Sequence, residues 1–128
     1  MKQVLECGMA RYPGLTLRVL TAEAPALGPG KARLIAAIEA TGSISAAARQ
    51  MGMSYRRAWQ LVEAINSSFN RPVVITAVGG KRGGGAEVTP FGREILATYQ
   101  RMEDKASAAI ARELKEFARL LRKPAVPR

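Results

Sequence analysis

Four consecutive residues and a nearby glutamine carry side chains suited to reading a nucleic acid: Ser54, Tyr55, Arg56, Arg57 and Gln60. The planar fork of arginine matches the O6/N7 edge of guanine, and glutamine matches adenine in the same bidentate way. Serine and tyrosine hydroxyls suit phosphates or thymine edges. These residue types at this spacing indicate contacts to double-stranded DNA. The alternative interpretation is a solvated helix face.

The elements that must position these side chains are two short helices within residues 43–65, which meet at a tight turn. We expect Ser45 to cap the first helix, Gly52 to end it in the left-handed conformation, and Ser54 to cap the second helix. Small apolar residues fall where the two helices must cross closely, and Ala48 is the most restrictive. The set is Ala47, Ala48, Met51, Met53, Ala58 and Leu61. This layout is typical of a helix-turn-helix whose second helix enters the major groove, although any tight helical hairpin could share it.

The second helix of the pair is predicted to be amphipathic. Its inward positions are Ala58, Leu61, Val62 and Ile65, whereas Glu63 faces outward with the residues named above. Trp59 lies near the boundary, where we expect it to act as a packing anchor rather than as a reader of bases.

A glycine-rich stretch, residues 79–85, surrounds Lys81 and Arg82. We expect a hairpin tip whose backbone N–H groups and two cations approach a phosphate chain or the minor groove. A nucleotide-binding P-loop is excluded because its Gly-Lys must be followed by Ser or Thr at the start of a helix. A hairpin tip without a binding role is the alternative.

The pattern of the other segments completes a small α-rich domain. It predicts a strand over 15–20, a connector over 24–30, and a helix over 31–40 with Leu34, Ile35 and Ile38 inside. The second helix of the pair should end near residues 66–68, with Phe69 as a core anchor. Strands are expected over 72–78 and 86–89, and Thr89-Pro90 is a strong helix start.

An apolar stripe follows in steps of three and four residues: Phe91, Ile95, Tyr99, Met102, Ala106, Ile110, Leu114, Phe117 and Leu121. Unbroken, about 31 residues would make a helix about 46 Å long. A helix that covers only its own domain would need about three turns. We therefore favour a dimer element, which would set two binding units against two half-sites.

Composition supports a polyanion as the partner and argues against catalysis. The chain of 128 residues has a net charge of +10, and residues 31–93 alone contribute +6. Such a charge attracts DNA, although anionic membranes attract basic proteins too. The chain has no histidine and a single cysteine, Cys7. We expect no enzyme activity, no metal site, no cofactor, no membrane span and no signal peptide, and a cytoplasmic location.

These residues carry a resemblance to a known family. The runs Gly42-Ser-Ile-Ser45, Gly52-Met-Ser-Tyr55, Ala58-Trp59 and Gly79-Gly-Lys-Arg-Gly-Gly-Gly-Ala86 resemble the N-terminal domain of the molybdate-responsive regulator ModE, over roughly residues 15–121. The resemblance implies a winged helix that dimerises through its terminal helix. It implies DNA contacts by Ser54, Tyr55, Arg56, Arg57 and Gln60 in the major groove and by Lys81 and Arg82 on the wing. We expect Ser43 and Ser45 to contact DNA as well.

The expected fold is mainly α with a small β-sheet, a winged helix-turn-helix with a long C-terminal dimerisation helix. Its parts are residues 1–14 without assigned structure, the DNA-binding domain 15–89, the dimerisation helix 90–122 and a tail 123–128. Because ModE regulators usually continue into molybdate-binding domains and this sequence stops at Arg128, we expect the short form that lacks them.

The expected function is a sequence-specific transcriptional regulator that binds an inverted-repeat operator as a homodimer and is linked to molybdenum metabolism. One alternative is a non-specific architectural DNA-binding protein. Another is an interaction module that heterodimerises with a longer homologue. An oxyanion-binding storage protein is a third and more remote candidate.

Overall fold

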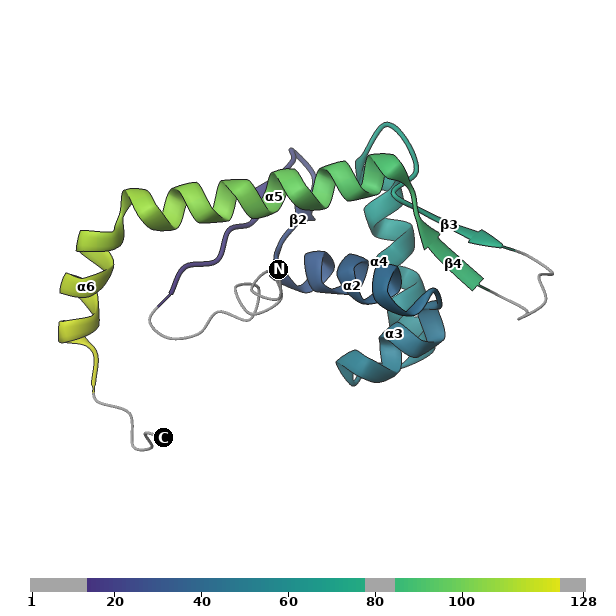
Figure 1. Cartoon of the computed structure of the whole chain (residues 1–128), viewed down its shortest axis with the longest axis horizontal. Coiled ribbons are helices and arrows are strands. Elements are labelled where there is room, and N and C mark those ends of the chain that lie inside the picture. The colour runs from purple at the N-terminus through teal and green to yellow at the C-terminus, as the bar shows by residue number, and fades with distance from the viewer. Residues whose placement is uncertain (1–13, 78–84, 123–128) are drawn as a thin grey trace.

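The computed structural model describes residues 14–77 and 85–122. Three helices form the centre of the domain: α2 (Pro29–Thr41), α3 (Ile44–Met51) and α4 (Tyr55–Ser68). Two short strands precede them, β1 (Val19–Leu20) and β2 (Pro25–Leu27), and a hairpin follows, β3 (Val74–Ala77) and β4 (Gly85–Val88). The chain then continues into α5 (Pro90–Ala109) and α6 (Ala111–Leu120). α5 runs across the top of the domain, and α6 turns away from it at the end far from the hairpin (Figure 1).

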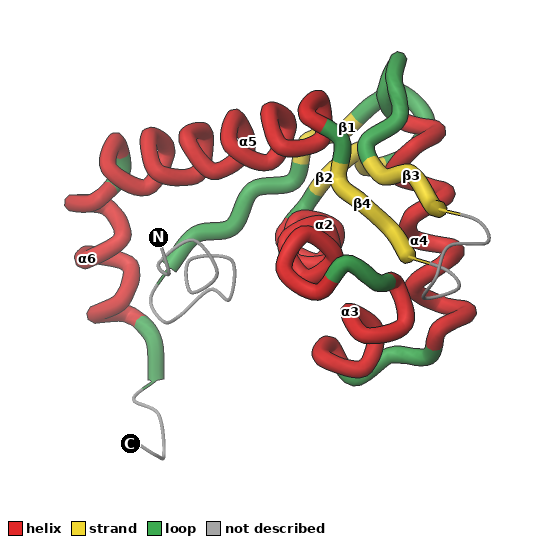
Figure 2. Tube along the Cα trace, turned by 45° about the vertical axis from the view of Figure 1, so that its right-hand side comes forward, coloured by secondary structure: helices red, strands yellow, loops and turns green. Residues whose placement is uncertain are grey.

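The core lies between α2, α3 and α4. Leu34, Ile35 and Ile38 of α2 are completely buried, as their spacing predicts. Ile65 of α4 is buried with them, and Phe69 packs against this cluster from the end of α4. The three-helix unit and the hairpin beside it form a winged helix, which confirms the expected fold class (Figure 2).

The first β-ribbon differs from the prediction. Only Val19–Leu20 of the expected strand 15–20 is a strand, and it pairs antiparallel with β2, which lies inside the expected connector. Ala26 and Leu27 are buried in the core. Proline is compatible with the first position of an edge strand, so Pro25 does not prevent the pairing. The helix that follows begins at Pro29, two residues earlier than predicted.

The predicted long helix is divided into two, so the single helix of about 31 residues that an unbroken stripe would form is not present. Ile110 leaves the helical conformation (φ −113°, ψ 23°) and separates α5 from α6. No residue after Glu103 in the described part of the chain is buried. Within the described residues, this stretch contributes no side chain to the hydrophobic core. Within residues 14–77 and 85–122, no helix has the length and apolar character needed to cross a bilayer.

Candidate nucleic-acid interface

Capping residues end α3 and begin α4 at the turn between them. Gly52 has φ 70°, and its backbone N–H donates to the carbonyls of Ala48 and Arg49. The Ser54 hydroxyl accepts from the N–H of Arg57 at 3.1 Å and caps α4 as predicted. The cap of α3 is Ser43, which accepts from Ala46 N at 3.0 Å, and not Ser45. The prediction for Ser45 is wrong because α3 already begins at Ile44, which places Ser45 inside its first turn.

The two helices cross closely because only methyl groups separate them. Ala47 and Ala58 are completely buried, and Ala48 is 3% exposed. Met51, Met53 and Leu61 pack around them and are partly buried. A longer side chain at any of the three alanines would push α4 away from α3. The small residues therefore fix the angle at which the outer face of α4 is presented.

The outer face of α4 carries the side chains that the sequence analysis selected. Ser54, Arg56, Arg57 and Gln60 are exposed, and Tyr55 is 55% exposed. Glu63 is exposed one turn further along. Neither Arg56 nor Arg57 forms an ion pair with a residue in the described ranges. The five predicted α4 contacts are thus all exposed at the N-cap and in the first two turns of the helix.

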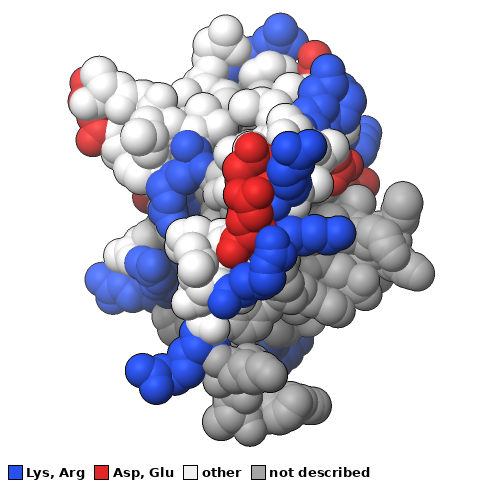
Figure 3. All heavy atoms as spheres, turned by 90° about the vertical axis from the view of Figure 1, so that its left-hand side faces the viewer, with Lys and Arg blue, Asp and Glu red and all other residues white. Residues whose placement is uncertain are grey.

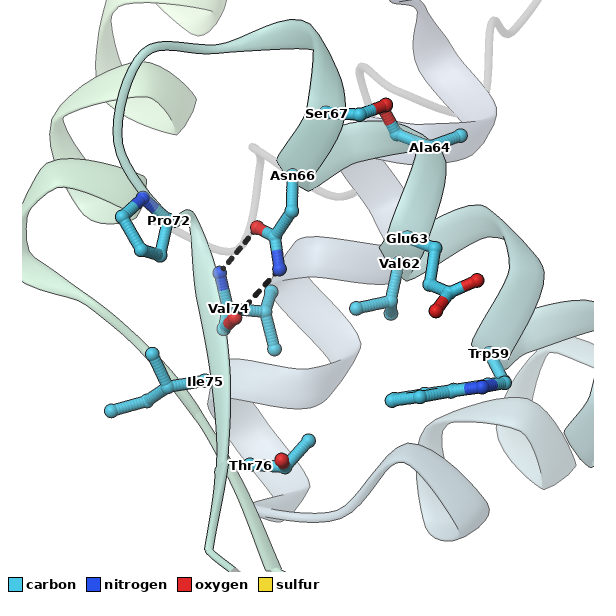
Figure 4. Close-up of a pocket in the computed structure, with 10 residues that line it drawn as sticks. All are labelled: Trp59, Val62, Glu63, Ala64, Asn66, Ser67, Pro72, Val74, Ile75 and Thr76. Atoms are coloured by element: carbon cyan, nitrogen blue, oxygen red, sulfur yellow. Dashed lines mark hydrogen bonds between the residues drawn. The ribbon is translucent and has the colours of Figure 1, made fainter.

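Trp59 has a different role from its neighbours on α4. Its indole is half-buried and packs against the core, in agreement with its expected role as a packing anchor. Together with Val74 and Thr76 it lines an open groove of about 810 Å³ between α4 and β3. Figure 4 shows Trp59 at one end of this groove and Asn66 at the other.

Asn66 joins α4 to the hairpin. Its Oδ1 accepts from the backbone N–H groups of Val73 (2.8 Å) and Val74 (3.1 Å), and its Nδ2 donates to the Val74 carbonyl at 2.9 Å. Figure 4 draws the pair of bonds between Asn66 and Val74. Sequence reasoning missed this role. The only signal was the position of Asn66 four residues after buried Val62, which puts its amide on the inner face of the helix.

The hairpin, which we call the wing, is hydrogen-bonded to the rest of the domain along both of its edges. Its strands pair in the register Val74↔Val88 to Ala77↔Gly85. On the outer edge of β4, the N–H of Ala86 donates to the carbonyl of Gly42 at 3.0 Å, in the turn between α2 and α3. Asn66 holds the opposite edge at β3. The wing therefore leaves the domain in a fixed direction beside α4 (Figure 2).

The other predicted contacts are less completely placed. Ser43 is half-buried and engaged in its cap, whereas Ser45 is exposed on the first turn of α3. Lys81 and Arg82 lie outside the described residues, so the expected cationic wing tip stays a prediction.

Among the described residues, the α6 end of the molecule presents an exposed apolar face. Residues 111–120 contain no buried side chain, and Phe117 is 61% and Leu121 44% exposed just where the predicted stripe places them. Tyr99, earlier in the stripe, is instead buried in the domain. Figure 3 looks onto the α6 end, where Lys and Arg groups surround a strip of Asp and Glu.

Comparison with known proteins agrees with this geometry. The bacterial regulatory helix-turn-helix proteins of the lysR family match residues 30–93, from α2 to the start of α5. The chain is 46% identical over 95 residues to the molybdenum-pterin-binding protein MopB of Rhodobacter capsulatus, which covers 74% of the chain and 34% of MopB. It is 38% identical over 87 residues to the molybdenum transport protein ModE of Azotobacter vinelandii, covering 68% of the chain and 32% of that protein.

A third relative is the DNA-binding transcriptional dual regulator ModE of Escherichia coli strain K12, 37% identical over 71 residues, or 56% of the chain and 27% of that protein. The chain therefore spans about a third of the length of the curated relatives it matches. These matches confirm the resemblance to ModE drawn from the sequence. With the family match extending over half of its length, the chain belongs to the bacterial regulatory helix-turn-helix proteins of the lysR family.

Proposed function

We propose that this protein is a sequence-specific DNA-binding transcriptional regulator that binds an inverted-repeat operator as a homodimer. One observation carries the proposal: Tyr55, Arg56, Arg57 and Gln60 are exposed together on the second helix of a rigid helix-turn-helix, beside a wing. A helix in this position fits the major groove, where arginine and glutamine distinguish base pairs. The protein acts by binding, without catalysis and without a cofactor of its own, in the cytoplasm.

The proposed contacts divide by chemistry. Arg56, Arg57 and Gln60 read base edges, whereas Ser54 and Tyr55 contact phosphates and thymine edges. Exposed Ser45 and the capping Ser43 lie on or next to the first turn of α3, from which they reach the flanking phosphates. Lys81 and Arg82 of the wing contact the backbone or the minor groove of the neighbouring DNA.

The link to molybdenum metabolism is proposed from the relatives. MopB is named for binding a molybdenum pterin, and the ModE of Azotobacter vinelandii for molybdenum transport. Because these matches cover 74% and 68% of this chain, we propose that it acts on operators near molybdenum-related genes.

A selection of bound duplexes from a random pool, followed by titration at several salt concentrations, tests the proposal. Arg57→Ala and Gln60→Ala should each cost about 1–3 kcal/mol on the selected sequence and little on random duplexes. Lys81→Ala and Arg82→Ala should weaken binding to both duplexes alike and reduce the salt slope by about 1 each.

Arg119→Ala is the matched control, because it removes the same charge from exposed α6, away from the proposed interface. It should leave sequence preference unchanged. Equal losses on selected and random DNA for the α4 variants would overturn base reading. A steep salt slope without any selected sequence would instead favour a non-specific architectural protein.

A further inference from the structure

A carboxyl group and a phenol are buried together on α5, outside the proposed DNA interface. Tyr99 and Glu103 are each 3% exposed. They lie one helical turn apart. Segment 14–20, which ends with β1, contacts this pair through Leu17. The Tyr99 Oη lies 2.6 Å from the backbone carbonyl oxygen of Leu17 and 3.3 Å from Glu103 Oε2. This cluster is thus the contact between α5 and segment 14–20.

Tyr99 Oη lies within hydrogen-bond distance of two oxygen atoms, so two hydrogen atoms are needed to form both bonds. The phenol has one of them, and an ionised Glu103 has none. A phenol has a single hydrogen to donate, and the shorter distance assigns it to the Leu17 carbonyl. Glu103 Oε2 then faces an oxygen lone pair on Tyr99 unless the carboxyl group is itself protonated and donates. A protonated Glu103 completes a chain of two hydrogen bonds, from the carboxyl group to Tyr99 Oη and from Tyr99 to Leu17.

The charges around the pair do not favour an ionised Glu103. Burial is the largest cause that raises its pKa, and Asp104 raises it further, whereas the neighbouring Tyr99 phenol and Leu17 backbone lower it by less. The pKa of Tyr99 is raised to about 12, first by burial and then by Glu103, so its phenol keeps its proton. From segment 14–20, Arg18 acts on Tyr99.

Two cations near the start of α2, Lys31 and Arg33, do not pair with Glu103. Lys31 Nζ donates to the carbonyl of Pro25 at 3.0 Å. Arg33 Nε is buried without a partner, as is Glu103 Oε1, among the residues described. Neither cation forms an ion pair with Glu103 within the described ranges. Among the described residues, therefore, no ion pair compensates a negative charge on this carboxyl group.

We propose that Tyr99 and Glu103 form a protonation-dependent latch that holds segment 14–20 against α5 and is closed when the Glu103 carboxyl group carries its proton. In the open state Glu103 is solvated and its pKa returns to the ordinary value of 4.5. Since the closed state has the higher pKa, the latch is tightest below pH 4.5. It loosens as the pH rises from there to the raised pKa, by up to tenfold in the opening equilibrium per pH unit. Above the raised pKa, Glu103 is ionised in both states, so the opening equilibrium no longer changes with pH.

Hydrogen exchange of the full-length chain at pH 5, 6, 7 and 8, corrected for the intrinsic exchange rate, tests the latch. We expect the protection of amides in residues 15–20 to fall with pH in the wild type. In Glu103→Gln the amide group donates to Tyr99 Oη at every pH, so protection should stay high and level. Glu94→Gln, which removes an exposed carboxylate from the same helix, should behave like the wild type.

If circular dichroism shows that Glu103→Gln is misfolded, two further measurements still test the latch. The ¹³C shift of the Glu103 carboxyl group in the wild type should titrate with a midpoint above 4.5, in step with the loss of protection. Tyr99→Phe should lower protection at low pH. A wild-type protection that is constant from pH 5 to 8, a Glu103→Gln profile parallel to the wild type, or a midpoint at or below 4.5 would overturn the proposal.

Discussion

At the residue scale, Gly92 is the glycine with the least room for a side chain among those in the described residues. A Cβ added there would overlap the carbonyl oxygen of Val73 and lie 2.8 Å from Val88 Cγ1, because α5 begins directly against both strands of the wing. We expect Gly92→Ala to lower the free energy of unfolding by about 1–3 kcal/mol or more. Urea unfolding of both the variant and the wild type measures the difference.

The matched control is Gly30→Ala, also in the first turn of a helix. A Cβ at Gly30 meets no heavy atom within 4 Å, so this change should raise the free energy of unfolding by about 0.4–1 kcal/mol. The opposite signs separate a steric effect from the general effect of replacing glycine. Equal shifts for the two variants would contradict the steric explanation.

Capping residues show how far local chemistry can be predicted. Gly52, Ser54 and Thr89 cap where the sequence indicates, because each is the one suitable residue at a clear boundary. Between Ser43 and Ser45 the residue types cannot decide, since either hydroxyl could cap a helix. The decision depends on α2, which ends at Thr41 and Gly42 and leaves Ser43 as the first residue free to cap.

At the element scale, the inward positions predicted for α4 are buried or partly buried, whereas the pairing of β1 with β2 was not predicted. The outward side of α4 follows from a helical period in one continuous segment. β2 forms because β1 pairs with it across a turn in which the Thr21 hydroxyl donates to the carbonyl of Ala24 at 2.7 Å. A strand of three residues that begins with a proline carries no periodic signal of such a partner. The interruption at Ile110 is likewise invisible, because no proline or glycine marks it.

Asn66 joins the wing to α4 through three hydrogen bonds. We expect Asn66→Ala to leave the N–H groups of Val73 and Val74 and the Val74 carbonyl without their partner, at a cost of about 1–3 kcal/mol for each buried group that water does not reach. Asn66→Asp keeps the acceptor but loses the donor, so its loss should be intermediate. Chemical unfolding gives the stability, and exchange of the Val74 amide reports the wing directly.

Ser67→Ala is the comparison, because Ser67 is exposed and its hydroxyl bonds only to Ala64 of its own helix, at 3.1 Å. It should change stability by less than about 0.5 kcal/mol. If Asn66→Ala were no more damaging than Ser67→Ala, the wing would be held mainly by its contact with Gly42 and not by α4.

At the scale of the whole molecule, the two ends have opposite characters. The helix-turn-helix end is a complete domain whose apolar side chains are buried together. The α6 end is apolar on one side and has no core of its own, although it remains helical. A helix of ten residues is marginal in water without packing, so an α6 that persists in solution requires a surface to cover it. In the proposed homodimer, a second copy of the chain related by a two-fold axis would supply the identical face.

The homodimer is therefore best tested on α6. Phe117→Asp places a charge in the proposed interface twice, once from each copy. Losing the burial of a phenylalanine, about 1.5–3 kcal/mol per copy, should raise the dissociation constant by roughly 10²–10⁴. Lys115→Gln, at an exposed position two residues earlier and thus on the other side of the helix, should leave it unchanged. Sedimentation velocity across micromolar concentrations distinguishes the species, and a wild-type chain that stays monomeric there would exclude α6 as the dimer element.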